Sequence, residues 1–101
     1  MEAGFAVWVT GGDERTSGRV AAAIADGLVQ RRIDVEVLDP RTPGIDALAG
    51  PGMERSTAFA ASSLVRHGVA VVVAVPSPSR AGRDDARAAI GRMIEVYVPV
   101  G

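Results

Sequence analysis

The chain has 101 residues, of which 48% are apolar, and its formal net charge is −1. This balance indicates one globular domain and argues against binding of nucleic acid through a basic surface. Cysteine is absent, which excludes disulfides, thiolate metal sites and a cysteine nucleophile.

The first predicted elements are a strand over residues 5–10 and a helix from about residue 17. The strand sequence, FAVWVT, is apolar on both faces, which is typical of a central parallel strand covered by helices. Apolar positions then recur at helical spacing at Val20, Ile24 and Leu28, and we expect Arg31 and Arg32 to complement the helix dipole at its end.

The turn between these two elements has the layout of a P-loop, in which a glycine-containing loop leads from a strand into a helix. A P-loop reads G-x-x-x-x-G-K-[ST]; its lysine contacts the β- and γ-phosphates and its hydroxyl residue holds Mg²⁺. Counted from Gly11, these last three positions are Thr16, Ser17 and Gly18. All 11 lysine or arginine positions of the chain are arginine, so the lysine is missing.

Anion binding at this turn stays open as an alternative, because N–H groups at a helix N-terminus attract anions. Arg15 and Arg19 would add positive charge, whereas Asp13 and Glu14 would oppose it. Turns of this kind also open many doubly wound domains that bind no phosphate. The candidate phosphate- or nucleotide-binding residues are Gly11, Gly12, Arg15, Thr16, Ser17, Gly18 and Arg19.

The rest of the chain continues to alternate between strands and helices, which predicts an α/β fold with a parallel sheet of about four strands and helices on both faces. The apolar runs are too short for a signal peptide or a membrane span, so we expect a cytoplasmic protein without membrane contact. The remaining predicted elements are a strand at 33–38 near the sheet edge, a loop with one short turn at 45–48, a helix at 53–67, a buried strand at 69–75, a helix at about 81–93 and a strand at 94–98.

Single residues elsewhere have structural interpretations. His67, the only histidine, lies in the last turn of the helix predicted at 53–67 and precedes Gly68, so we expect it to cap that helix. Asp84 and Asp85 are expected to complement a helix N-terminus. Trp8 and Tyr97 are expected in the core or at an interface.

Four segments together resemble adenylylsulfate kinase, the P-loop enzyme that phosphorylates the 3′-hydroxyl of adenosine 5′-phosphosulfate with MgATP. The resemblance covers almost the whole chain and implies a single, three-layer P-loop kinase-like domain over residues 1–101. It also implies truncation, because the family continues into a lid helix and a last strand. The segments are GFAVWVTG at 4–11, DVEVLD at 34–39, HGVAVVVAVPSPSRAGRD at 67–84 and IEVYVPV at 94–100.

The resemblance also implies a nucleotide-substrate side, which this chain keeps only in part. The family's Asp-Gly-Asp after the second strand is Asp39, Pro40 and Arg41 here, so the second acid has become a cation. The family's Ser-Pro-Tyr-Arg has lost its tyrosine. The candidate substrate-side residues are Asp39, Arg55, Ser77, Arg80 and Arg83.

These departures predict an adenylylsulfate-kinase-like domain that is catalytically inactive and acts as a regulatory or structural binding partner, with nucleotide or anion binding as a retained property. No catalytic residue, metal or cofactor is predicted. The expected partners are a second copy or another protein, and an adenosine phosphosulfate-type nucleotide. One alternative is an active adenylylsulfate kinase that uses ATP and Mg²⁺; another is an unrelated small-anion-binding module.

Overall fold

The elements of the chain alternate between strand and helix as expected. The structure, a computed structural model, describes residues 4–39, 52–75 and 80–99. The predicted turn at 45–48 and the candidate residue Ser77 lie outside these residues. The elements are β1 (Phe5–Gly11), α1 (Glu14–Gln30), β2 (Val35–Leu38), α2 (Gly52–Arg66), β3 (Ala70–Val73), α3 (Arg80–Ile90) and β4 (Met93–Val98).

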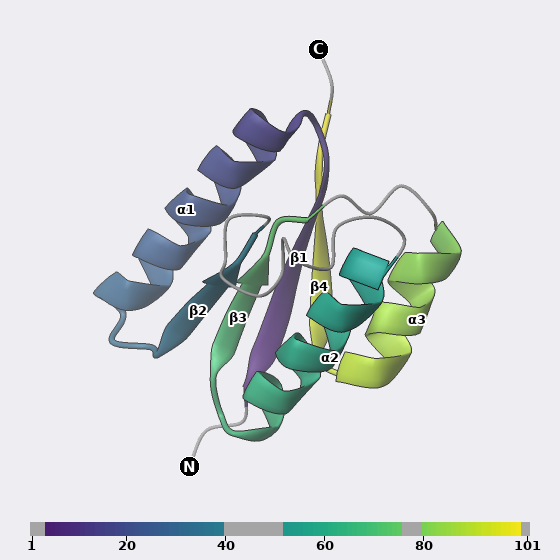
Figure 1. Ribbon diagram of the computed structural model, residues 1–101. Coiled ribbons are helices and arrows are strands. Elements are labelled where there is room, and N and C mark those ends of the chain that lie inside the picture. Colours follow the sequence, from purple (N-terminus) through teal and green to yellow (C-terminus); the bar gives the residue numbers. More distant parts are fainter. Residues whose placement is uncertain (1–3, 40–51, 76–79, 100–101) are drawn as a thin grey trace.

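The four strands form one parallel sheet in the order β2-β3-β1-β4. β1 pairs with β3 from Phe5↔Ala70 to Trp8↔Val73 and also pairs with β4, so the predicted central position of β1 is confirmed. β2 lies at one edge, as its acidic alternation predicted. Helix α1 covers one face of the sheet, and α2 and α3 lie side by side on the other (Figure 1). The predicted three-layer α/β architecture is confirmed.

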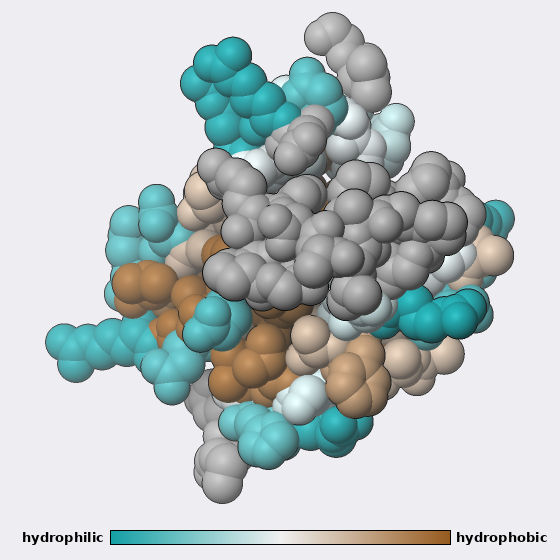
Figure 2. Space-filling model, viewed as in Figure 1, coloured by the Kyte–Doolittle hydropathy of each residue, from teal (hydrophilic) through white to brown (hydrophobic). Residues whose placement is uncertain are grey.

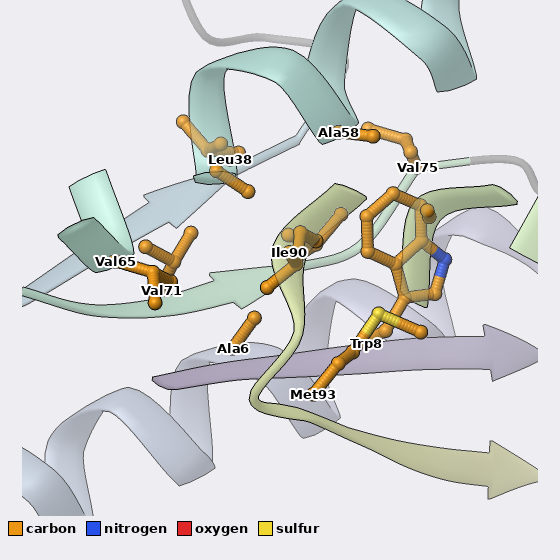
Figure 3. Close-up of a cluster of buried hydrophobic side chains, with 12 residues drawn as sticks. Ala6, Trp8, Leu38, Ala58, Val65, Val71, Val75, Ile90 and Met93 are labelled. Carbon is orange, nitrogen blue, oxygen red and sulfur yellow. The ribbon is translucent and has the colours of Figure 1, made fainter. Parts of the chain in front are cut away.

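The side chains of β1 alternate between two separate hydrophobic cores, one on each face of the sheet. On the α2/α3 face, Ala6 and Trp8 join a cluster with residues of both helices. Trp8 is fully buried and lies with Val75 and Met93 in this cluster (Figure 3). On the α1 face, Val7 and Val9 pack with residues of α1. Neighbouring residues of β1 reach opposite faces because side chains alternate along a strand. The burial of Trp8 confirms the expectation that it is a core residue.

Helix α1 begins at Glu14, three residues before the predicted start. The reason is Asp13, whose extended backbone and side-chain hydrogen bond cap the helix. At the other end, α1 has no basic residue in its last turn; Arg31 is the C-cap and Arg32 follows with φ 62°. Both arginines therefore directly follow the C-terminal end of the helix, and their complementation of its dipole stays a prediction.

Helix α2 ends at Arg66, one residue before the predicted end, and Gly68 follows it as expected. This glycine has φ 82°, and its N–H donates to the carbonyl of Val65 at 3.1 Å. The His67 Nδ1 lies 2.7 Å from the Ser63 carbonyl oxygen, to which it donates. The capping role expected for His67 is therefore confirmed.

Helix α3 spans Arg80–Ile90 and stops at Gly91, which has φ 84°. Met93 was predicted in this helix but opens β4, because the left-handed glycine turns the chain back into the sheet. The first turn of α3 holds no acidic residue, so the expected dipole role of Asp84 and Asp85 is also wrong. No helix in the described part of the chain is long and apolar enough to cross a membrane.

Candidate functional site

The turn from β1 into α1 is the first candidate site, and two consecutive glycines shape it. Gly11 has φ 78° and Gly12 has φ 64°, in the left-handed region that glycine adopts without strain. A Cβ added at Gly11 would lie 2.4 Å from the carbonyl oxygen of Val98. The turn therefore needs glycine at position 11 both for its backbone angle and for the close approach of β4.

Asp13 occupies the N-terminus of α1 with its own carboxylate. Oδ1 accepts a hydrogen bond from the Thr16 N–H at 2.7 Å, and the Asp13 carbonyl oxygen accepts the Ser17 N–H at 2.9 Å. The bond from the Thr16 backbone holds the pKa of Asp13 below its ordinary value of 3.8, because it favours the charged form. At neutral pH the end of α1 thus carries a fixed negative charge that belongs to the protein.

Residues 14–19, which would wrap the phosphates in a P-loop of this register, lie in α1. Thr16 and Ser17 are in its first turn, and Gly18 takes the position of the Mg²⁺ hydroxyl. Arg15 and Arg19 are exposed. These residues do not fit a magnesium–triphosphate group, because a carboxylate takes one of the free N–H groups and the lysine and hydroxyl positions are replaced. No group of three histidine or acidic residues suited to a metal lies within the described residues.

The substrate-side candidates follow the carboxyl ends of the parallel strands, where ligands of open α/β sheets bind. Asp39 comes directly after β2 and is half-buried; Arg55 is exposed in the first turn of α2. On α3, Arg80 is exposed and Arg83 is half-buried. The parallel topology therefore brings these candidates to the end of the sheet where the strands have their carboxyl ends, and the β1–α1 turn lies at this same end.

A second candidate site, which the sequence reasoning missed, is a groove between α2 and α3. It has a cavity volume of about 270 Å³ and is lined from both helices, by Arg55 and Phe59 among others on α2 and by Asp85 and Ala86 among others on α3. Phe59 is 73% exposed. A signal was present in the sequence: Phe59 stands outside the apolar stripe of α2, four residues after Arg55 and three before Ser62.

The strand order and the turn from the central strand into α1 define an α/β domain of the P-loop kinase type. The sequence profile of the family Adenylylsulphate kinase matches residues 3–101, and the chain belongs to this family. The resemblance drawn from the four sequence segments is therefore confirmed.

Relatives and solved structures agree with this assignment. An adenylyl-sulfate kinase of Synechococcus sp. (strain JA-2-3B'a(2-13)) is 35% identical over 103 residues, which cover 94% of this chain and 59% of the relative. A structure of an APS kinase mutant from Mycobacterium tuberculosis is 27% identical, with a TM-score of 0.78 over 96% of this chain and 77% of that one. A structure of that kinase in complex with AMPPNP and APS is 26% identical, with a TM-score of 0.74, and covers 96% and 63% of the two chains. This chain spans less than two thirds of the curated relatives' length.

Proposed function

We propose that this chain is a non-catalytic member of the adenylylsulfate kinase family, which acts by binding a protein partner and does not transfer phosphate. The observation that carries the proposal is the carboxylate of Asp13 at the N-terminus of α1, 2.7 Å from the Thr16 nitrogen. Phosphoryl transfer depends on cations and oriented N–H groups that stabilise the charge on the phosphates. A fixed carboxylate at that position repels a triphosphate instead.

The absence of a lysine in the turn also predicts a large loss of phosphoryl-transfer rate. Ser17 stands at the lysine position of the P-loop register, and no lysine exists in the chain to replace it. A single well-placed cation in phosphoryl transfer is worth on the order of 10³–10⁵ in rate. We therefore expect turnover to be lost, with no metal or nucleotide cofactor needed for the protein's role.

The test is a phosphoryl-transfer assay of the purified chain with MgATP and adenosine 5′-phosphosulfate. The 35%-identical Synechococcus kinase, assayed in parallel, shows that the conditions support the reaction. We expect no 3′-phosphorylated product above the uncatalysed rate. Turnover that rises with the concentration of this chain and disappears in the Arg19→Ala variant would overturn the proposal and establish the alternative, an active kinase using ATP and Mg²⁺.

A second candidate function is that of a sulfonucleotide sensor, which binds adenosine 5′-phosphosulfate without reacting. It is favoured by the arginines at the starts of α2 and α3, namely Arg55, Arg80 and Arg83, and by the relative solved with APS bound. A ligand at about 100 times its Kd stabilises a protein by about 2.7 kcal/mol. A rise in the thermal midpoint with this nucleotide, and none with inorganic phosphate, would support the sensor over an unspecific anion-binding module.

A further inference from the structure

The strand β4 forms an edge of the sheet and carries two exposed apolar side chains. Among the described strands it pairs with β1 alone, and Figure 1 draws it in yellow beside β1. Ile94 is 58% exposed and Tyr97 is 71% exposed. An edge strand presents backbone N–H and C=O groups to which another strand can pair. The outer side of β4 is therefore a candidate interaction surface.

The backbone hydrogen bonds of β4 show which of its residues face outward. The Ala6 N–H donates to the Arg92 carbonyl oxygen at 2.8 Å, and Ala6 is aligned with Met93. Successive residues of a strand turn their N–H and C=O groups to opposite sides, so every second residue bonds to the same neighbour. The residues that bond to β1 are therefore Ile94, Val96 and Val98, and those that face outward are Met93, Glu95 and Tyr97.

Two features restrict pairing at the outer side of β4 to its middle. At the start of the strand, the Met93 carbonyl oxygen already accepts a hydrogen bond from Arg87 Nη1 at 2.8 Å. Beyond the end of the strand, the next outward residue is Pro99, which has no N–H to donate. Within the described part of the chain, Glu95 and Tyr97 are left with both backbone groups facing outward.

The side chains of β4 alternate between the two faces of the sheet. Glu95 Oε1 lies 3.4 Å from Arg87 Nη2 of α3, so Tyr97, two residues later, lies on the α2/α3 face. Val96 packs against the core on the α1 face, so Ile94 lies on that face. A strand that extends the sheet must match this alternation.

We propose that the protein partner at this edge is a second copy of the chain, paired antiparallel through β4 about a twofold axis perpendicular to the sheet. Glu95 of each copy exchanges backbone hydrogen bonds with Tyr97 of the other, and the two Val96 residues lie opposite each other on the axis. Ile94 of each copy lies opposite Val98 of the other, which covers its exposed side chain. The two four-stranded sheets become one. The inference rests on the protein-binding part of the proposed function and not on the loss of catalysis.

Charge and backbone chemistry select this register. A shift by two residues in one direction places Glu95 opposite Glu95, and like charges directly opposite each other are destabilising. A shift by two in the other direction places Glu95 opposite Pro99, which cannot donate a hydrogen bond. A shift by one residue sends the apolar side chains to the wrong face. The same strand supplies both sides in one register, so the assembly is closed and does not propagate into fibres.

The opposite edge of the sheet, β2, does not offer this pairing. Apolar side chains gather over β2 and β3 in the view of Figure 2. The Ala70 N–H donates to the Asp34 carbonyl oxygen at 3.0 Å. The alternation then turns Val35 and Val37 outward. Pairing of these two residues about a twofold axis would place Glu36, which is exposed, opposite Glu36. Of the two edges, β4 is therefore the self-complementary one.

A single pair of strands makes a small interface, below the roughly 1,200 Å² of specific, stable complexes. We therefore expect a weak dimer with a dissociation constant between about 1 μM and about 1 mM. The first experiment is sedimentation equilibrium of the full chain over this range of concentration, which should show a monomer–dimer equilibrium.

A pair of variants at position 97 tests the contact by the sign of a charge. Tyr97→Glu places an acid opposite Glu95 of the other copy, and Tyr97→Lys places a cation there. Both variants lose the same side chain, which is 71% exposed. Because the contact occurs twice, Tyr97→Glu should dimerise about tenfold more weakly than Tyr97→Lys. Phe59→Ser, in the groove between α2 and α3, should leave the equilibrium unchanged.

Cysteine cross-linking tests the register. The chain contains no cysteine, so an introduced thiol reacts only with its counterpart in another copy. In Val96→Cys the two Cα atoms should be about 4.5 Å apart, within the range of a disulfide. The matched control is Ile94→Cys. Because Ile94 lies opposite Val98, its two copies are offset by four residues, roughly 14 Å. Oxidised glutathione should therefore give a covalent dimer of Val96→Cys and not of Ile94→Cys, although Ile94 is the more exposed residue.

Three results would overturn the inference. The first is a monomer at every concentration up to about 1 mM. The second is equal dimerisation of Tyr97→Glu and Tyr97→Lys, above all if Phe59→Ser abolishes the dimer, which would assign the contact to the groove between α2 and α3. The third is cross-linking of Ile94→Cys as efficient as that of Val96→Cys. None of these bears on the phosphoryl-transfer assay, so failure of the dimer and failure of the proposed loss of catalysis are distinguishable.

Discussion

The two faces of the sheet differ in what they leave open. On the α1 face, the turn from β1 into α1 carries the Asp13 carboxylate, which accepts a hydrogen bond from the Thr16 N–H. On the other face, two helices bury the larger core but leave a groove of about 270 Å³ beside an exposed phenylalanine. The comparison teaches that membership of a family does not show which surface of a chain is available to a ligand or partner. Local helix capping and the size of surface side chains decide which surface is available.

The largest expected loss of stability distinguishes the core on the α2/α3 face from the core on the α1 face. Trp8→Ala removes a fully buried indole from the α2/α3 core and should cost about 3–5 kcal/mol of unfolding free energy. Val9→Ala removes two methyl groups from the α1 core and should cost about 2 kcal/mol. Urea denaturation followed by circular dichroism measures both, since Trp8 is the only tryptophan. Equal losses would mean that the two cores contribute alike.

The β1–α1 turn is tested by comparing a substitution of Gly11 in the turn with a substitution of Gly27 within α1. The two substitutions should change the free energy of unfolding in opposite directions. Gly11→Ala forces a Cβ at φ 78° to within 2.4 Å of the Val98 carbonyl oxygen, and the left-handed backbone alone costs about 1–2 kcal/mol. Gly27→Ala lies within α1 with no atom near its Cβ and should stabilise by about 0.5–1 kcal/mol. If both changes shifted the urea midpoint the same way, the turn would not be held as described.

The cap at Asp13 makes stability depend on pH. The folded pKa of Asp13 is lowered from 3.8 by the Thr16 backbone hydrogen bond, so its contribution is present above pH 3.8 and is lost as the pH falls through the folded pKa. Asp13→Ala should lower the thermal midpoint modestly at neutral pH. Asp13→Asn, which still caps a helix, should lose less and should flatten the acid side of the profile. An unchanged acid limb in Asp13→Asn would show that the capping carboxylate contributes nothing there.

The smallest expected effect lies where α3 meets β4. Arg87 Nη2 is 3.4 Å from Glu95 Oε1, and both side chains are partly exposed. Glu95→Gln should therefore cost at most about 0.5 kcal/mol, and less in high salt. Arg87→Ala also removes the hydrogen bond to the Met93 carbonyl oxygen at 2.8 Å, and should cost about 1 kcal/mol. A larger loss for Glu95→Gln than for Arg87→Ala would contradict this ranking.

Most of the fold was predictable because it depends on local periodicity. The buried run that became β3 and the alternation that became β2 both appear in the sequence, and so does the glycine that ends α2. The errors occurred at helix ends. Counting the P-loop register from Gly11 concealed the N-cap signal of Asp13, and the apolar character of Met93 extended a helix past Gly91.

The candidate site was predictable only in part. The glycines of the turn and the absence of lysine are visible in the sequence. The capping bond of Asp13 is a side-chain geometry that the register argument did not anticipate. The groove was missed because it joins Phe59 to Ala86 and Ala89, about 30 residues apart in the chain.

The sequence by itself determined the alternation of strands and helices, the family and the absence of lysine, because these reside in composition, periodicity and local order. The tertiary structure decided the order β2-β3-β1-β4, the early start of α1 and the pairing of α2 with α3 across one face. Each of these features depends on which contacts form between distant segments, or between a side chain and the backbone. Their free energies depend on the packing of the whole domain, which no local pattern contains.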